Sequence, residues 1–255
     1  MRVIGVIPAR YGSSRLPGKP LKMLGSMTLL ERVWRGVINS KELDRVVIAT
    51  DHLAIEQEAR RFGAETVMTD PHYVNGSERL AAALKLIGEE KTDIAVNIQG
   101  DMPFITGAII DRAVTFLKSS FDSFSMVTIA SPIFEEGMFH SPSDVKIVFD
   151  GEKKALYFSR APIPCSRDGD REKDSNGKTV YGYKHYGLYV FKREKLSCYL
   201  NTPLSRLEEI EKLEQLRLLE QGHSIGVVIV SPSEMGANIE VDTEEDLIKA
   251  QKVLS

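Results

Sequence analysis

The chain has 255 residues, of which 42% are hydrophobic and 27% charged, and its formal net charge is −3. This apolar fraction and low net charge exclude a disordered chain, and no run of 18 apolar residues predicts a membrane-spanning helix. The nearly neutral balance argues against a general nucleic-acid-binding protein, because such domains are usually strongly basic.

The charge is nevertheless unevenly distributed along the chain. Residues 1–35 contain seven basic residues and one acidic residue, a net charge of +6, so the remainder carries −9. A basic N-terminal segment on an acidic body indicates a local site for an anion. The alternative is a chance clustering of solvated side chains.

The cysteines and the N-terminus indicate the cellular compartment of the protein. Cys165 and Cys198 are too few for a disulfide framework, and neither belongs to a CxxC motif. The first ten residues lack the small-residue cleavage site of a signal peptide. We therefore expect a reduced, cytoplasmic protein with no membrane partner.

Residues 1–124 alternate short apolar segments with amphipathic segments of about a dozen residues. The expected strands are 2–7, 45–49, 66–68 and 94–98, and the expected helices are 28–38, 52–62, 77–88 and 106–118. This alternation predicts βαβ units and an α/β fold with a parallel sheet. Because such sheets bind ligands at the carboxyl ends of their strands, the segments 8–20 and 99–103 are expected to face one another.

The pattern changes in residues 125–255, where strand-like segments follow one another without long helices. The expected strands are 125–131, 144–149, 155–158, 186–191 and 224–230. The polar segment 164–183 is expected to form a loop or arm. One helix is expected over 205–221, and another begins near 242–245 and runs to the C-terminus. With no long linker, 1–255 is predicted to be a single domain.

The segment Pro8-Ala-Arg-Tyr-Gly-Ser-Ser-Arg-Leu-Pro-Gly-Lys-Pro20 carries the strongest chemical signal. It has three cations, two hydroxyls and no acid, and its small residues let backbone N–H groups approach an oxyanion. A Walker loop is excluded, because five residues separate the glycines and Pro20 follows Lys19. No Gly-x-Gly occurs, so a dinucleotide fingerprint is absent as well. The segment indicates a site for a highly charged anion such as a triphosphate.

This loop resembles the signature of the sugar cytidylyltransferases, and further motifs narrow the resemblance. In chain order they are Asn75-Gly-Ser-Glu-Arg-Leu80, Asn97-Ile-Gln-Gly-Asp101, Tyr157-Phe-Ser-Arg-Ala-Pro-Ile-Pro164, Lys184-His-Tyr-Gly-Leu-Tyr189, Leu213-Glu-Gln-Leu-Arg217 and Val241-Asp-Thr243. Together they resemble the 3-deoxy-manno-octulosonate (Kdo) cytidylyltransferase family, the CMP-Kdo synthetases of lipopolysaccharide assembly, over essentially the whole chain.

The resemblance implies a Rossmann-like nucleotidyltransferase fold with a mostly parallel central sheet and an inserted β-rich region for dimerisation and sugar binding. Residues 1–124 would form the nucleotide-binding half, and 125–255 the sugar-binding and dimerisation half. The implied reaction joins Kdo, or its 8-amino analogue, to the CMP part of CTP and releases pyrophosphate. Mg²⁺ is the implied cofactor, a homodimer the implied assembly, and 155–190 its interface.

The resemblance also assigns roles to individual residues. The implied metal ligands, Asp101 and Asp242, are catalytic together with Lys19. The implied nucleotide-binding residues are Arg10, Ser13, Ser14, Arg15, Lys19, Arg79 and Gln99. The implied sugar-binding residues are Arg160, His185, Tyr189, Glu214 and Gln215. Independently of the resemblance, Mg²⁺ prefers carboxylate and phosphate oxygens, which a pair of aspartates and a triphosphate supply.

Plainer structural interpretations remain open at each position. Asp101 suits a turn, Asp242 suits a helix cap, and the His and Tyr of 184–189 suit a core. One residue also departs from the family pattern Gln-Gly-Asp-Glu-Pro. Met102 replaces its glutamate and is expected to remove a negative charge close to the reacting centre, which leaves the identity of the sugar open. Two other functions stay open: synthesis of a CMP-nonulosonate of the sialic-acid type, and a non-catalytic nucleotide-binding module.

Overall fold

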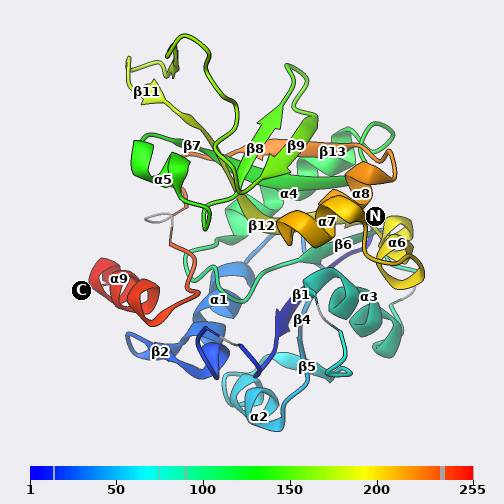
Figure 1. The fold of residues 1–255 in the computed structure, drawn as a ribbon. Helices are drawn as coiled ribbons and strands as arrows, with labels where there is room; N and C mark the ends of the chain where they lie inside the picture. The colour runs from blue at the N-terminus through cyan, green and yellow to red at the C-terminus, as the bar shows by residue number, and fades with distance from the viewer. Residues whose placement is uncertain (14, 74, 90, 236–238, 255) are drawn as a thin grey trace.

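A nine-stranded sheet lies at the centre of the computed structural model, which describes residues 1–13, 15–73, 75–89, 91–235 and 239–254. Seven strands follow the order β13-β7-β12-β6-β1-β4-β5, while β8 pairs with β12 and β9 pairs with β8 (Figure 1). Within the seven-strand path only β12 is antiparallel to its neighbours. The predicted mostly parallel α/β sheet is therefore confirmed.

The observed elements are bounded as follows. The strands are β1 (Val3–Ala9), β2 (Met23–Leu24), β3 (Met27–Thr28), β4 (Arg45–Thr50), β5 (Glu65–Met68), β6 (Ile94–Asn97), β7 (Met126–Ile133), β8 (Lys146–Phe149), β9 (Ala155–Ser159), β10 (Glu172–Lys173), β11 (Thr179–Val180), β12 (Gly182–Lys192) and β13 (Ile225–Ile229). The α-helices are α1 (Leu29–Val37), α2 (Leu53–Arg61), α3 (Gly76–Leu86), α4 (Gly107–Ser119), α5 (Glu136–His140), α6 (Ser197–Asn201), α7 (Arg206–Glu211), α8 (Leu216–Glu220) and α9 (Glu244–Leu254), with 3-10 turns at Lys19–Leu21 and Arg193–Leu196.

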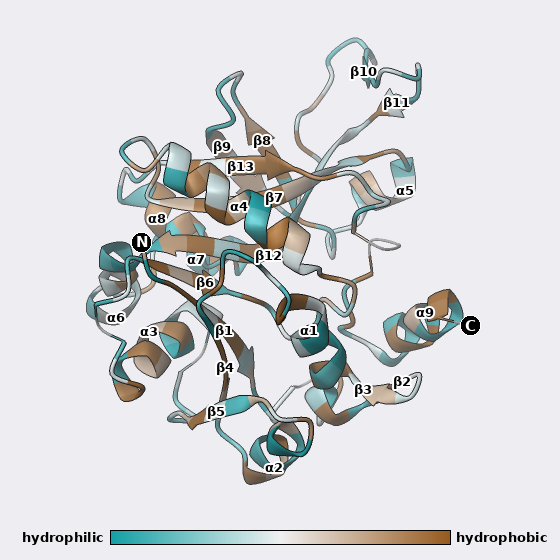
Figure 2. Cartoon of the chain, turned by 180° about the vertical axis from the view of Figure 1, so that it is seen from behind, coloured by the Kyte–Doolittle hydropathy of each residue, from teal (hydrophilic) through white to brown (hydrophobic). Residues whose placement is uncertain are grey.

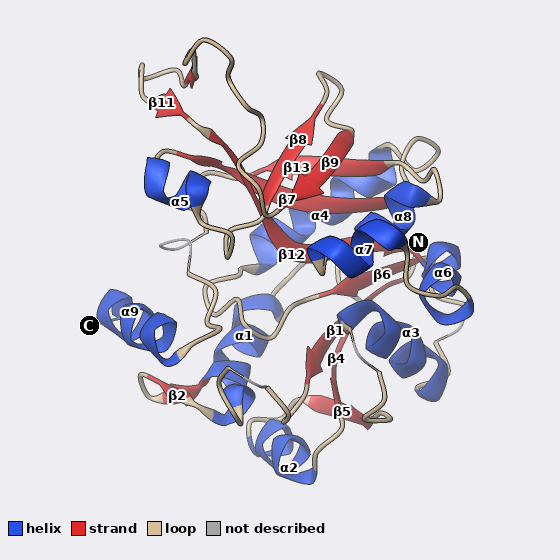
Figure 3. Ribbon diagram, in the orientation of Figure 1, coloured by secondary structure: helices blue, strands red, loops and turns tan. Residues whose placement is uncertain are grey.

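Buried apolar residues form a cluster on each face of the sheet, and helices lie on both sides of it (Figures 2 and 3). In β1, Val3 and Ile7 join the cluster on the α1, α2 and α4 side, whereas Ile4 and Val6 join the cluster on the α3 side. This alternation follows from the two-residue period of a strand. A sheet covered on both faces leaves its strand ends as the place for a site.

Several boundaries differ from the sequence prediction. The expected helix over 205–221 is two short helices, because Lys212 adopts a left-handed backbone (φ 55°) that ends α7. The expected strand 186–191 begins earlier, at Gly182. The arm 164–183, which projects from the top of the molecule in Figure 1, contains the short β10–β11 pair. Within the described ranges, no helix combines the length and apolarity needed to cross a bilayer.

Candidate active site

The loop at residues 8–20 leaves the carboxyl end of β1 and is folded tightly on itself. The Tyr11 carbonyl accepts hydrogen bonds from the backbone N–H groups of Ser13 (2.9 Å) and Gly18 (3.2 Å). Gly18 has a φ of 65°, which favours glycine, and it introduces the 3-10 turn that begins at Lys19. Leu16 is buried in a small apolar cluster with α9 residues. The loop is thereby fixed against the C-terminal part of the chain.

Two carboxylates from distant parts of the sequence meet at the end of this loop. Lys19 Nζ lies 3.0 Å from Asp101 Oδ2 and 3.0 Å from Asp242 Oδ1. Arg15 contacts the other oxygen of Asp242 at 2.9 Å. A backbone hydrogen bond of 2.8 Å from Val241 to the Asp101 carbonyl holds the two segments side by side. Lys19, Asp101 and Asp242, predicted as the catalytic group, are therefore brought together.

The charges of this cluster stabilise one another. Burial alone would lower the pKa of Lys19, but Asp101 and Asp242 outweigh it and the pKa is raised. Burial alone would raise the pKa of Asp242, but Lys19 and Arg15 outweigh it and the pKa is lowered. The protein thus holds a positive charge between two carboxylates at neutral pH.

The carboxylate of Asp242 does not cap α9. At the start of α9 it is Thr243 that acts as the cap, since its hydroxyl accepts from the Asp246 N–H at 3.2 Å. The Asp246 carboxylate accepts in return from the Thr243 N–H at 3.0 Å. The Asp242 carboxylate is consequently directed to the loop cations.

A pocket of about 320 Å³ opens beside this cluster. All described members of the predicted nucleotide-binding set line it, namely Arg10, Ser13, Arg15, Lys19, Arg79 and Gln99. Ser14 lies outside the described residues. Arg79 is 2% exposed and its guanidinium contacts Asp51 at 2.9 Å, so its position is fixed by the residue that follows β4. Tyr73, which sequence reasoning did not single out, also lines the pocket, as do Asn75 and Gly76, which belong to a quoted motif but were given no role.

Two glycines make room for Gln99 at the junction of the site. A Cβ atom at Gly76 would lie 3.1 Å from Gln99 Nε2, and one at Gly187 would lie 2.9 Å from Gln99 Cγ. Gln99 thereby fits between the first turn of α3 and β12, and it lines both this pocket and the next. These glycines belong to the motifs 75–80 and 184–189, and they are the sequence signal for the space that Gln99 occupies.

A second pocket, of about 560 Å³, adjoins the first and shares Arg15, Gln99, Asp101 and Asp242 with it. Of the predicted sugar-binding residues, Arg160, His185 and Tyr189 line it. The register between β12 and β7 shifts between Tyr186 and Tyr189. Such a bulge redirects side chains, and it lies beside His185 and Tyr189.

Internal hydrogen bonds hold the two β12 side chains. His185 Nε2 lies 2.9 Å from Thr128 Oγ1, and burial lowers the pKa of His185 to about 3, so the ring is neutral. The Tyr189 hydroxyl donates to Gln215 Oε1 at 3.0 Å, and burial raises its pKa. Gln215 therefore acts behind Tyr189 and does not line the second pocket itself.

The break between α7 and α8 positions Glu214 and Gln215. Both were expected on a continuous helix, but they lie in the turn that follows Lys212. Glu214 accepts from the Ser77 N–H at 3.1 Å and lines the first pocket, and burial raises its pKa to about 7. Gln215 is 1% exposed, and its Nε2 has no hydrogen-bond partner among the described residues.

Arg160 is held at the rim of the second pocket by backbone groups. Its Nε donates to the Glu211 carbonyl at 2.8 Å, and its Nη1 donates to the Pro142 carbonyl at 3.0 Å. These contacts fix the guanidinium from two segments, and Arg160 lines the second pocket.

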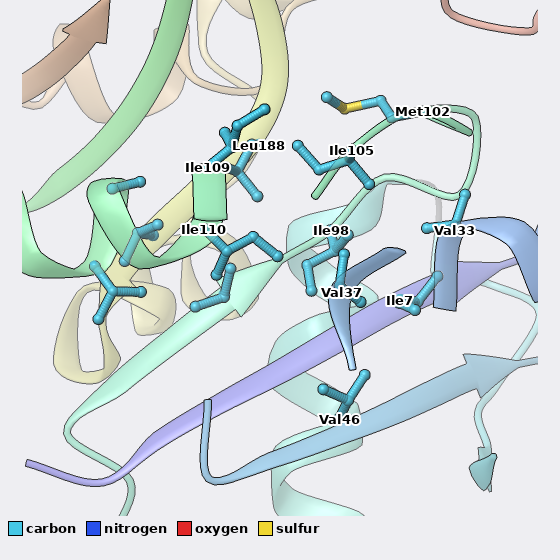
Figure 4. Packing of buried hydrophobic residues seen from close by; sticks show 14 of the residues in the cluster. Ile7, Val33, Val37, Val46, Ile98, Met102, Ile105, Ile109, Ile110 and Leu188 are labelled. Carbon is cyan, nitrogen blue, oxygen red and sulfur yellow. The ribbon is translucent and has the colours of Figure 1, made fainter. Parts of the chain in front are cut away.

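The position expected to alter the reacting centre, Met102, does not border it. Met102 is 2% exposed, packs beside Ile105 in the main apolar cluster (Figure 4) and lines neither of the two pockets. The expectation was therefore wrong in its placement. Adjacent residues of the turn point to different sides, so Asp101 faces the site while Met102 faces the core.

Sequence reasoning missed two charged groups at the second pocket, Lys212 and Glu240. Glu240 lines this pocket and contacts Lys184 Nζ at 3.2 Å, while Lys184 also contacts Asp144 at 2.8 Å. Lys184 is almost fully buried, and its pKa is raised because the nearby carboxylates outweigh burial. The spacing of Glu240, two residues before Asp242, is the signal that identifies it in retrospect.

The position between Asp101 and Asp242 is where this site could hold a metal cation. Within the described part of the chain, no cluster of three or more His, Cys, Asp or Glu side chains is arranged to hold a metal. Asp101 and Asp242 are the two carboxylates that already share one cation, the Lys19 ammonium. A metal bound here would need further oxygen atoms from a ligand.

Comparisons with known proteins place the chain in a family. Residues 4–225 match the family model described as Cytidylyltransferase. The chain is 41% identical over 247 residues to the 8-amino-3,8-dideoxy-manno-octulosonate cytidylyltransferase of Shewanella woodyi, covering 97% of this chain and 96% of the relative. It is also 41% identical over 262 residues to the 3-deoxy-manno-octulosonate cytidylyltransferase of Thermodesulfovibrio yellowstonii, covering 100% and 99%.

A solved structure also matches along its length. This is CMP:2-keto-3-deoxy-manno-octonic acid synthetase complexed with CTP, which has a TM-score of 0.86 and 31% identity. The match covers 100% of this chain and 98% of that structure.

Proposed function

Because the chain belongs to the cytidylyltransferase family, we propose that it transfers the cytidylyl group of CTP to an acidic eight-carbon sugar. The sugar is Kdo or its 8-amino-3,8-dideoxy analogue, and the products are the CMP-sugar and pyrophosphate. One observation carries this proposal. Lys19 joins Asp101 and Asp242 where the first pocket meets the second.

The first pocket suits the nucleotide. Its loop supplies Arg10, Arg15 and Lys19, and the cations neutralise the charge of a triphosphate. Phosphoryl and nucleotidyl transfer depend on positioning and on electrostatic stabilisation more than on a covalent nucleophile. The rigid loop and the buried Arg79–Asp51 pair provide that positioning.

We propose that Mg²⁺ is the cofactor and that Asp101 and Asp242 hold it. The fit rests on their shared cation and on the preference of Mg²⁺ for one or two carboxylates together with phosphate oxygens. When bound, Mg²⁺ neutralises phosphate charge. Lys19 and Arg15, which pair with the aspartates here, are then available to the triphosphate.

The second pocket suits the sugar, and the reaction takes place at its junction with the first. The anomeric hydroxyl oxygen forms a bond to the α-phosphorus, the bond to the bridging α–β oxygen breaks, and the hydroxyl proton is released. Pyrophosphate leaves with the electron pair of the broken bond. Arg160 offers a cation to the sugar carboxylate, while His185 and Tyr189 orient the hydroxyl groups.

We also propose a cytoplasmic homodimer whose product is used in lipopolysaccharide assembly. The interface would lie in 155–190. Support comes from Leu156, which is exposed on β9, a strand at the outer side of β8. Contact between two copies there would cover Leu156. Light scattering at the molecular mass of a single chain would contradict the dimer.

The experiment that tests the function is a pyrophosphate-release assay with CTP, Mg²⁺ and each acid sugar. We expect release with an octulosonate and none without sugar. A nine-carbon sialic-type sugar as the preferred substrate would replace the proposed function by its nearest alternative. CTP binding without release, with any acid sugar, would leave only a nucleotide-binding module.

A further inference from the structure

The second pocket has one wall whose negative charge is not fully balanced. Glu240 lies on this wall with 28% of its side chain exposed. Its ion-pair partner is Lys184, whose ammonium is 3.2 Å from Glu240 and 2.8 Å from Asp144. One cation is therefore shared by two carboxylates, so this triad (Asp144, Lys184 and Glu240) has a formal charge of −1, and the buried Lys146 interacts with its Asp144 member and not with Glu240.

The surroundings of Glu240 strengthen its interaction with a ligand. Glu240 also lines a small cavity bounded by apolar groups that include Met102, Phe104 and Ile239. Electrostatic interactions gain strength beside such a low-dielectric wall. Met102 has no charged or polar group that could pair with the Glu240 carboxylate. The carboxylate therefore remains available to a ligand in the second pocket.

The rest of the pocket has a defined polarity. Arg160 and Lys212 line it as cations, whereas the neighbouring Asp101 and Asp242 already share Lys19 and Arg15. Glu240 is thus the lining carboxylate whose triad retains a negative charge. A sugar acid that also carries an ammonium group complements a pocket with cations on one part and a carboxylate on another.

We propose that Glu240 determines which octulosonate is used, by binding the ammonium group of the 8-amino sugar. This inference rests on the proposed function. An ammonium presents three donors and a positive charge, whereas the C8 hydroxyl of Kdo presents one donor and no charge. Charge-assisted hydrogen bonds are roughly twice as strong as neutral ones. We expect kcat/KM for the 8-amino sugar to exceed that for Kdo by about 10- to 100-fold.

The test compares both sugars in the pyrophosphate-release assay, with the full-length enzyme, CTP and Mg²⁺. Glu240→Gln keeps the shape of the side chain and removes its charge. We expect it to lower kcat/KM for the 8-amino sugar at least about tenfold, mainly through KM, and to change kcat/KM for Kdo less than about threefold. The KM for CTP stays unchanged.

Two further variants separate the charge of Glu240 from its structural role. Glu240→Asp retains the carboxylate and is expected to retain the preference for the 8-amino sugar. Glu245→Gln removes the same charge from the exposed first turn of α9, outside both pockets, and is expected to leave both sugars unaffected. Melting temperatures show whether each variant is folded.

The outcomes are distinguishable. A wild-type enzyme that uses Kdo as well as the 8-amino sugar would overturn the inference while leaving the proposed function intact. An equal loss for both sugars in Glu240→Gln would also overturn it, because a structural role does not discriminate between them. No pyrophosphate release with either sugar would refute the proposed function itself.

Discussion

Replacing Asp242 by asparagine tests the centre of the site, because it removes a charge with almost no change in volume. Asp242 accepts from Lys19 at 3.0 Å and from Arg15 at 2.9 Å, and 36% of its side chain is exposed. Ion pairs this exposed contribute about 0.2–1 kcal/mol each, so the loss of stability should be roughly 1 kcal/mol. For a chain of this size, that corresponds to a fall in Tm of about 2–4 °C.

The expected loss of activity is far larger than this loss of stability. Removing one preorganised group that acts on developing phosphate charge costs about 10²–10³ in turnover. Pyrophosphate release with CTP and an octulosonate measures it, over a range of Mg²⁺ concentrations. Asp122→Asn, an exposed aspartate after α4, is the matched control and should be unaffected. Near-normal activity of Asp242→Asn with unchanged Mg²⁺ dependence would refute the role as a ligand.

The pH dependence of the same variant has a defined sign. The pKa of Asp242 is lowered in the folded state, since Lys19 and Arg15 outweigh burial. Its stabilising contribution is therefore present above the ordinary value of 3.8 and is lost as the pH falls through the lower folded value. The difference in unfolding free energy between the wild type and Asp242→Asn should exist at pH 7 and vanish in strong acid. A difference that persists there would show that charge is not its cause.

Three further changes test the surrounding structure. Burial raises the pKa of Glu214 to about 7, so the stability of the wild type falls as the pH rises from 4.5 to 7. In urea unfolding, Glu214→Gln should be more stable than the wild type at pH 8 by up to about 3 kcal/mol. At pH 4 the two proteins should be equally stable. Tyr189→Phe leaves Gln215 Oε1 without its 3.0 Å donor and should cost about 1–3 kcal/mol, and an unchanged urea midpoint would contradict this. Gly76→Ala would bring a Cβ atom to 2.8 Å from Asn97 Nδ2, so we expect the free energy of unfolding to fall by about 1–3 kcal/mol and the KM for CTP to rise. An unchanged KM for CTP would show that the turn adapts to the added methyl group.

The parts of the site that follow from local sequence were predicted well. A strand ending at a glycine- and proline-rich loop with three cations places those cations at the carboxyl end of β1, whatever the rest of the chain does. The turn after β6 follows the same rule for Gln99 and Asp101. Because β1 and β6 are parallel neighbours, the two segments meet as expected.

The parts that depend on long-range packing could not be read from local patterns. The apolar spacing of 205–221 is helical, and no signal marks Lys212 as the residue that adopts a left-handed backbone. The register shift in β12 depends on pairing with β7, where Tyr186 pairs with Ile129 and Tyr189 with Thr128, 57 and 61 residues earlier in the chain. Met102 illustrates the same limit, since its neighbour Asp101 faces the site and only tertiary packing turns Met102 into the core.

The uneven charge of the chain takes on a specific meaning in the folded protein. The N-terminal cations Arg15 and Lys19 are not simply free for an anion, because Asp242 and Asp101 already pair with them. Arg10 lines the first pocket without such a partner among the described residues. A triphosphate that takes Arg15 and Lys19 as its partners leaves two adjacent carboxylates without a cation, and their mutual repulsion is then costly. The proposed Mg²⁺ would offset this repulsion, so we expect CTP and Mg²⁺ to bind cooperatively rather than in two independent steps.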